Sequence, residues 1–171
     1  MKIGILGYGN LGRGVEFAVK ENADMELAAV FTRRNPADLK IATENVPVVK
    51  VDDAENWQDK IDVMILCGGS ATDLPKQTPQ FAKFFNVIDS FDTHAKIPEH
   101  FAAVDESAKN SNHVAIISVG WDPGLFSRPR LLPKLQNIHA NVFVLSKVQD
   151  FFLRELHQVP RRLELYIVLH F

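Results

Sequence analysis

Short apolar runs alternate with amphipathic stretches along most of this chain. The run "KIGIL", Lys2–Leu6, is closed by a glycine and is typical of a strand buried in a parallel sheet. The next stretch has apolar residues at Leu11, Val15, Ala18 and Val19, the spacing of one helix face. The pattern then repeats, and it predicts further strands at Met25–Phe31, Val46–Val51, Ile61–Cys67, Asn86–Phe91 and His113–Gly120.

Helical patterns fill the intervals between these strands. Helices are predicted at Asn10–Asn22, Ala54–Lys60, Asp73–Phe85 (with Pro79 inside it) and Pro98–Asn112. Alternating strands and helices indicate an α/β fold, a Rossmann-like doubly wound parallel sheet. Ligands in such folds bind beyond the carboxyl ends of the strands. The residues to weigh are therefore Gly7–Gly12, Thr32–Arg34, Cys67–Asp73, Asp89–His94 and Gly120–Gly124.

Composition narrows the class of protein. The 171 residues suit one domain, or one domain and part of a second, and 46% apolar content is ordinary for a globular core. There is no 18-residue apolar run for a membrane span, no signal-peptide pattern, and a single Cys, so we expect a cytoplasmic protein without disulfides. A net charge of −2 argues against bulk nucleic-acid binding.

The glycine-rich stretch "GYGNLG", Gly7 to Gly12, fits G-x-G-x-x-G directly after a strand and at the start of a helix. Gly7 permits the tight turn, Gly9 lets a pyrophosphate approach, and Gly12 lets helix pack closely on strand. The helix N-terminus offers free N–H groups to the phosphates. We therefore predict a dinucleotide site, against the alternative of a glycine turn that binds nothing.

Two arginines stand where many dinucleotide-binding folds have a carboxylate. Thr32, Arg33 and Arg34 follow the second strand, and no Asp or Glu lies between Phe31 and Ala37. An acidic residue there would bind the ribose 2′-hydroxyl of NAD, whereas arginine accommodates the 2′-phosphate of NADP. The predicted cofactor is therefore NADP; the alternative is a pair of solvated surface arginines.

The ends of the fourth, fifth and sixth strands supply the remaining candidates. Cys67 is interpreted as a small apolar residue, since no neighbouring His or Lys would activate a thiolate, and Asp73 as a helix N-cap. Asp92 and Asp122 are placed at adjacent strand ends, where two carboxylates suit a substrate ammonium group; Trp121 offers an apolar wall. Each Asp alone is also a common turn residue. No Cys/His/Asp spacing for zinc occurs, so no metal is predicted.

The last 44 residues differ from the rest. From Arg128 onward the net charge is +4, against −6 before it, and all nine glycines lie at or before Gly124. Average glycine usage would place roughly three glycines in a tail of that length.

Five motifs in this order resemble the family of meso-diaminopimelate D-dehydrogenases: "GYGNLGRGVE", "FTRR", "LCGGSATD", "DSFDTH" and "ISVGWDPGLFS". The resemblance covers Met1 to about Ser127. It implies an NADP-dependent, homodimeric enzyme that oxidatively deaminates the D-centre of meso-2,6-diaminopimelate to L-2-amino-6-oxopimelate and ammonia, in the direction of lysine biosynthesis. It also implies a Rossmann domain and a separate domain for substrate binding and dimerisation.

The resemblance also implies roles for individual residues. The pyrophosphate would be held by Gly7, Gly9, Asn10, Leu11 and Gly12. The 2′-phosphate would be held by Thr32, Arg33 and Arg34. The ribose and nicotinamide would be lined by Cys67, Ser70, Ala71 and Thr72. The D-amino centre of the substrate would be held by Asp92, Trp121 and Asp122.

Residues 128–171 depart from the family pattern, because the glycine-rich segments that follow "GWDPGLFS" in the family are missing. We expect a Rossmann domain over 1–127 and an atypical tail over 128–171, a truncated or frameshifted remnant of the substrate domain; a genuine short variant is the alternative. Two other functions stay open: an NADP-binding module without turnover, and another Rossmann reductase such as dihydrodipicolinate reductase. A sugar oxidoreductase is disfavoured because Asp89–Asp92 replaces the usual Glu-Lys-Pro.

Overall fold

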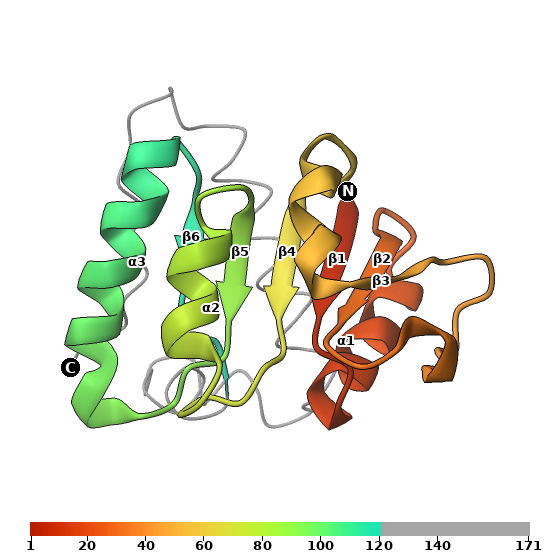
Figure 1. The fold of residues 1–171 in the computed structure, drawn as a ribbon, viewed down its shortest axis with the longest axis horizontal. Helices are drawn as coiled ribbons and strands as arrows, with labels where there is room; N and C mark the ends of the chain where they lie inside the picture. Colours follow the sequence, from red (N-terminus) through yellow and green to blue (C-terminus); the bar gives the residue numbers. More distant parts are fainter. Residues whose placement is uncertain (121–171) are drawn as a thin grey trace, which may run out of the picture.

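The structure is a computed structural model and describes residues 1–120. Six strands form one sheet: β1 Lys2–Leu6, β2 Glu26–Thr32, β3 Val48–Lys50, β4 Val63–Leu66, β5 Asn86–Asp89 and β6 Ala115–Ile116. Every neighbouring pair is parallel, and the order is β3-β2-β1-β4-β5-β6. Figure 1 shows β4 and β5 pointing the same way. Because all neighbouring pairs are parallel, the carboxyl ends of the six strands share one edge of the sheet.

Helices and short helical turns connect the strands. The α-helices are α1 Asn10–Lys20, α2 Leu74–Phe81 and α3 Ile97–Ser111, and the 3-10 helices are η1 Pro36–Asp38, η2 Val51–Lys60 and η3 His94–Lys96. In Figure 1, α2 and α3 lie beside the half of the sheet formed by β4, β5 and β6. No helix in residues 1–120 is long and apolar enough to cross a membrane.

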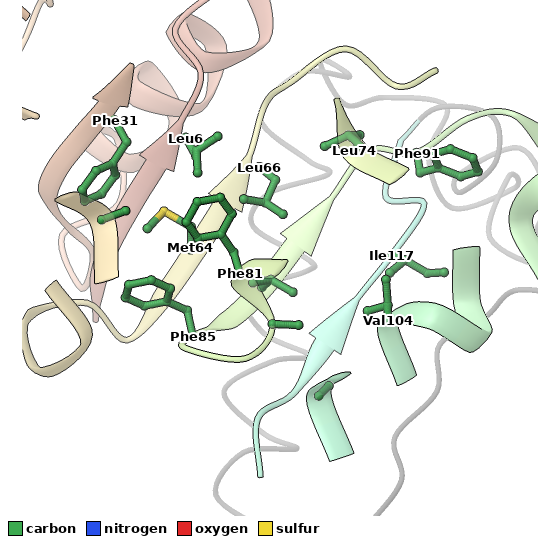
Figure 2. Close-up of a cluster of buried hydrophobic side chains, with 14 of the residues drawn as sticks. Leu6, Phe31, Met64, Leu66, Leu74, Phe81, Phe85, Phe91, Val104 and Ile117 are labelled. Atoms are coloured by element: carbon green, nitrogen blue, oxygen red, sulfur yellow. The ribbon is translucent and has the colours of Figure 1, made fainter. Parts of the chain in front are cut away.

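The strands are apolar on both faces because both faces carry a core. Alternate residues of β4 show this: Met64 and Leu66 pack in one cluster, and Val63 and Ile65 pack in the other. The first cluster lies against α2 and α3 and includes Phe81, Phe85 and Val104. Figure 2 shows Phe81 and Phe85 beside Met64, and Val104 beside Ile117. The second cluster lies against α1. A sheet covered on both faces confirms the predicted doubly wound fold.

The predicted elements all exist, but several are shorter than their apolar runs. The sixth strand was predicted over eight residues and contains only Ala115 and Ile116, because Ser118 has a positive φ of 58° that ends the extended backbone. The third strand ends at Lys50, and the helix that follows is a 3-10 helix. The helix around Pro79 persists but ends at Phe81.

Candidate active site

The predicted site residues meet at the carboxyl edge of the sheet. The chain leaves β1 toward β2 and β3 on one side, whereas β4, β5 and β6 continue on the other side. The strand order thus reverses between β1 and β4, which is where open parallel sheets of this kind bind their ligands. Trp121 and Asp122, predicted to complete the site, lie outside the described residues, and so does the predicted tail.

The glycine turn has the geometry of a phosphate cradle. Gly7 has a φ of +94° and donates its N–H to the Phe31 carbonyl at 2.9 Å. A Cβ on Gly12 would lie 2.2 Å from the Gly7 carbonyl oxygen, so only glycine fits there, whereas a Cβ on Gly9 would meet nothing within 4 Å. The space above Gly9 is therefore open to a ligand.

The first turn of α1 completes this cradle. Gly9 is its N-cap, no side chain caps it, and no acidic residue stands in its first turn. Asn10 and Leu11, the first two helical residues, are exposed. Amides at such a helix start are a natural anion site, so the turn fits the diphosphate that the sequence predicts.

Thr32 and Arg34 form a compact turn directly after β2. The buried Thr32 hydroxyl oxygen accepts the Arg34 N–H at 3.1 Å, and the Arg34 Nη2 donates to the Tyr8 carbonyl at 3.3 Å. This second contact places the Arg34 guanidinium beside the glycine turn. Its remaining N–H groups stay available to an anion.

Arg33 has a different partner. Its Nη1 and Nη2 donate to the two oxygens of the Asp73 carboxylate at 2.9 and 3.0 Å. Asp73 stands at the N-cap position of α2, but its side chain does not cap the helix. The predicted capping role is therefore wrong. The carboxylate instead accepts the Gly69 N–H at 2.9 Å, because the turn from Gly69 to Asp73 brings that donor closer.

The environment of Asp73 keeps it charged. The Gly69 N–H lowers the pKa of this carboxyl, partial burial opposes that effect, and the Arg33 guanidinium lowers the pKa further. Ala71 and Thr72, both exposed, belong to the same turn, and the Thr72 N–H donates to the Gly69 carbonyl at 3.3 Å. The turn therefore presents a fixed anion at the crevice.

Cys67 lies at the end of β4 and behaves as an apolar residue. Its N–H donates to the Leu6 carbonyl at 2.7 Å, and its side chain packs against the cluster on the α1 face. Burial raises the pKa of its thiol to about 12, so the thiol is protonated at neutral pH. This agrees with the interpretation of Cys67 as a small core residue.

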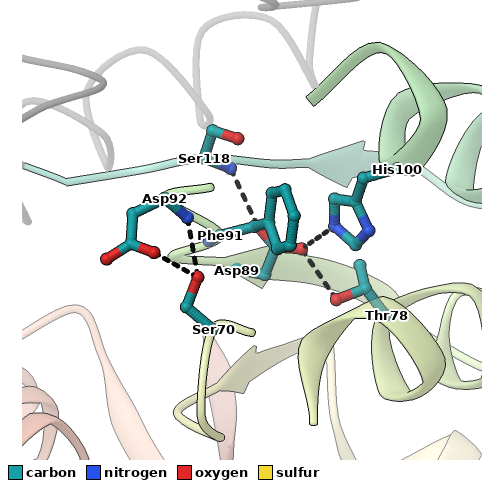
Figure 3. Close-up of polar contacts among 7 residues, drawn as sticks. All are labelled: Ser70, Thr78, Asp89, Phe91, Asp92, His100 and Ser118. Atoms are coloured by element: carbon teal, nitrogen blue, oxygen red, sulfur yellow. Dashed lines mark hydrogen bonds and ion pairs between the residues drawn. The ribbon is translucent and has the colours of Figure 1, made fainter. Parts of the chain in front are cut away.

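Ser70 and Asp92 bind each other across the ends of β4 and β5. The Ser70 hydroxyl donates to the Asp92 carboxylate, and the Asp92 N–H donates to the Ser70 Oγ at 2.9 Å. Figure 3 shows both contacts. The Asp92 side chain is exposed at the sheet edge. The loop after β4 thus orients a carboxylate that belongs to the loop after β5.

The sequence reasoning weighed Asp89 as part of a loop but gave no role to this buried carboxylate behind Asp92. Asp89 Oδ2 accepts from the Thr78 hydroxyl at 2.7 Å and lies 2.6 Å from His100 Nε2, and its Oδ1 accepts the N–H groups of Phe91 and Ser118 at 3.1 and 2.8 Å. Figure 3 shows these four groups around Asp89. The signal available was an Asp ending an apolar strand, a position that needs donors when it is buried.

A second buried carboxylate fixes the loop after η1. Glu16, fully buried in α1, accepts from the Tyr8 hydroxyl and from the Thr43 N–H, the latter at 2.6 Å. Burial alone would raise the pKa of Glu16, but the hydrogen bonds from Tyr8 and Thr43 outweigh it and leave that pKa below its usual range. Burial, followed by the bond to Glu16, raises the pKa of Tyr8. The sequence signal was an acidic residue beside Val15 on the apolar stripe.

Comparison with known proteins gives clear relatives. A meso-diaminopimelate D-dehydrogenase from Lysinibacillus sphaericus is 67% identical over 132 residues, which is 77% of this chain and 40% of the relative. The solved structure of the diaminopimelate dehydrogenase of Corynebacterium glutamicum in complex with diaminopimelate matches with a TM-score of 0.69 at 42% identity, over 77% of this chain and 40% of that one.

An engineered D-amino acid dehydrogenase bound to NADP⁺ matches with a TM-score of 0.70, also at 42% identity and with the same coverage of the two chains. No protein-family model matches the chain. The chain spans about two fifths of the length of the curated relatives that it matches. Over the matched residues, this protein is a homologue of the meso-diaminopimelate D-dehydrogenases and shares their Rossmann-like domain.

Proposed function

We propose that this chain carries the cofactor-binding part of an NADP-dependent oxidoreductase. One observation carries the proposal: after β2, beside a glycine turn that is open above Gly9, the chain presents Arg33 and Arg34 with Thr32, and no carboxylate follows that strand before Ala37. A doubly charged 2′-phosphate gains charge-assisted hydrogen bonds there, whereas a bare ribose hydroxyl does not.

The reaction that we propose is the oxidative deamination of the D-centre of meso-2,6-diaminopimelate to L-2-amino-6-oxopimelate and ammonia. Homologues of this name, one related structure with NADP⁺ and one with diaminopimelate support it. The chain spans only about two fifths of the length of those relatives, so their activity does not follow for this chain from the similarity alone and is stated as a proposal. A homodimer and a place in the cytoplasm belong to the same proposal.

The residues at the sheet edge fit the cofactor. The amides that begin α1 and the open space at Gly9 would hold the diphosphate, with Asn10 and Leu11 beside it. The ribose and nicotinamide would lie along the loop after β4, against Cys67 and the turn that contains Ser70, Ala71 and Thr72. When bound, NADP⁺ supplies the hydride acceptor.

The substrate side is assigned to Asp92, with Trp121 and Asp122. The exposed Asp92 carboxylate is oriented by Ser70, so it can hold an ammonium group in one position. A hydride leaves carbon only when the attached nitrogen has a free lone pair. The ammonium must therefore lose a proton first, and a carboxylate beside it is a suitable acceptor.

One assay on the purified protein tests the proposal. NADP⁺ and NAD⁺ are each added with meso-diaminopimelate, and NADPH or NADH is followed by absorbance. The proposal expects binding, measured by fluorescence titration, that favours NADP⁺. It expects NADPH formation by a protein in which these residues are joined to a substrate domain like that of the relatives. NADP⁺ binding without any turnover by such a protein would favour the alternative, a dinucleotide-binding module. Reduction of a dihydrodipicolinate, with no oxidation of diaminopimelate, would favour the other reductase.

A further inference from the structure

An ion pair links the loops on the two sides of the glycine turn. Arg33 directly follows β2, and the Asp73 that it contacts in a bidentate manner follows β4. In the sheet, β1 lies between these two strands. The pair therefore reaches across the end of β1, at the switch point where a dinucleotide would lie.

This contact uses the part of Arg33 that a phosphate would use. Both terminal nitrogens donate to Asp73, one to each carboxylate oxygen. An end-on fork is one of the two bidentate geometries with which a guanidinium grips a phosphate, and this fork cannot serve both anions at once. We propose that Asp73 is a specificity-determining residue whose carboxylate competes with the cofactor 2′-phosphate for Arg33, an inference that rests on the proposed function.

The two partners differ in how firmly they are held. The Asp73 side chain is 16% exposed and also accepts the Gly69 N–H, so it stays in place when the pair opens. The Arg33 side chain is 67% exposed and is the partner that moves. An ion pair this exposed is weak, so it opens readily.

Competition for Arg33 and charge repulsion from Asp73 both weaken the binding of NADP⁺. A 2′-phosphate that takes Arg33 must displace one carboxylate and then remain close to its negative charge. NAD⁺ lacks that phosphate and meets neither obstacle. Asp73 therefore lowers the preference for NADP⁺ below the value that Arg33 and Arg34 alone would give.

Replacing Asp73 by Asn isolates the effect. The Asn side chain keeps an oxygen for the Gly69 N–H and loses the charge that holds Arg33. We expect NADP⁺ to bind roughly three- to tenfold more tightly and NAD⁺ to change less than twofold, since one exposed ion pair and one repulsion are removed. NMR titration of labelled protein with each dinucleotide measures both constants, even where binding is weak. Asp105→Asn, which removes a carboxylate paired with Lys109 on α3, serves as the control.

Several results would overturn the competition. Unchanged or weaker NADP⁺ binding by the folded Asp73→Asn protein would show that Asp73 orients Arg33 and does not compete for it. A gain that survives in Arg33→Ala/Asp73→Asn would show that Asp73 does not act through Arg33. Asp73→Ser, whose hydroxyl can also accept the Gly69 N–H, gives the same test where the Asn variant fails to fold.

Different results would refute the proposed function and the competition by Asp73. A wild-type protein that binds NADP⁺ and NAD⁺ equally would refute the 2′-phosphate site, and the competition with it. A clear wild-type preference for NADP⁺, without any gain in Asp73→Asn, would overturn the competition alone.

Discussion

Arg34 is the arginine whose guanidinium already lies beside the glycine turn, through its contact with the Tyr8 carbonyl. Replacing Arg34 by Ala removes a charge-assisted contact to the proposed 2′-phosphate, worth about 1.5–3 kcal/mol. We expect NADP⁺ affinity to fall on the order of 10- to 100-fold and NAD⁺ affinity to stay nearly unchanged. Fluorescence titration of both cofactors measures this, with Lys109→Ala on α3 as the control. Equal weakening of both cofactors would refute the assignment.

Ser70 gives a second prediction for a single residue. Its hydroxyl proton is donated to Asp92, so Ser70→Ala should let the Asp92 carboxylate rotate away from the substrate ammonium. We expect kcat/KM for meso-diaminopimelate to fall about tenfold, the value of one such hydrogen bond. The Kd of NADP⁺ should change much less, because Ser70 is only one of several residues in the turn proposed to line the cofactor. Ser70→Thr should restore most of the activity.

A role of Ser70 through Asp92 also has a signature in a double variant. Ser70→Ala should have little further effect on kcat/KM once Asp92→Asn has removed the carboxylate, because the two residues act as one unit. Losses that multiply in the double variant, or a Kd for NADP⁺ that weakens as much as kcat/KM falls, would instead indicate that Ser70 acts mainly through the cofactor and not through Asp92.

For single residues, the sequence allows a correct prediction where a position can be filled by only one type of residue. Gly7 and Gly12 could be predicted because a positive φ and a close backbone contact admit only glycine. Asp73 was misassigned because an Asp before a helix is usually a cap, and its real partners, Arg33 and Gly69, depend on how β2 and β4 are ordered in the sheet. Pairings between distant loops leave no local pattern in the sequence.

Asp89 joins several elements of the fold, because the groups that donate hydrogen bonds to it come from α2, α3 and the ends of β5 and β6. Asp89→Ala would leave several buried donors without a partner, at about 1–3 kcal/mol each. We expect the free energy of unfolding in urea to fall by roughly 3 kcal/mol or more, and Asp105→Asn to change it little. A loss under about 0.5 kcal/mol, the usual scatter for surface substitutions, would show that the network does not join these elements.

Glu16 joins α1 to the loop that contains Thr43, and its effect depends on pH. Because its pKa is lower in the folded protein than the ordinary 4.5, the stabilisation is fully present above about pH 4.5 and is lost as the pH falls through the folded pKa. We expect Glu16→Gln to be less stable than wild type at pH 7, with the difference narrowing toward pH 3. Urea unfolding at several pH values measures this, and a difference that does not change with pH would contradict it.

The kinds and order of elements could be predicted from the sequence, but their ends could not. Apolar runs mark where the chain is buried, and burial continues past the last paired residue. The run from His113 to Gly120 shows this, because only Ala115 and Ile116 pair with β5 while Ile117 stays buried beyond the strand. Strand ends are set by the pairing partner and by turns such as that at Ser118, which an apolar pattern does not record.

At the scale of the whole molecule, the division into a Rossmann domain over 1–127 and an atypical tail over 128–171 stays a prediction. Two relatives match 132 of the 171 residues, and the net charge and the glycine content of the sequence change after Ser127. We expect a polypeptide of these 171 residues to bind NADP⁺ weakly and not to oxidise meso-diaminopimelate. Positioning of the reacting carbon can contribute about 7–11 kcal/mol to lowering a barrier, and residues 128–171 lack the glycine-rich segments that the resemblance leads one to expect there.

NADP⁺ titration of that polypeptide, and an assay of NADPH formation with meso-diaminopimelate, test whether it binds the cofactor weakly and lacks turnover. Robust turnover would show that residues 121–171 build a substrate pocket. Sequencing of the encoding DNA addresses the origin of the tail separately: a segment resembling the relatives in another reading frame downstream would support a frameshift, and its absence would refute one.

The Arg33–Asp73 contact also has a consequence for ionic strength. Added salt screens the attraction between Arg33 and a 2′-phosphate, but it equally screens the attraction between Arg33 and Asp73 that must be given up. Binding thus exchanges one ion pair for another, and the two salt effects largely offset. The preference for NADP⁺ should therefore decline less steeply with added KCl in the wild-type protein than in Asp73→Asn, which makes cofactor choice less sensitive to the salt content of the cell.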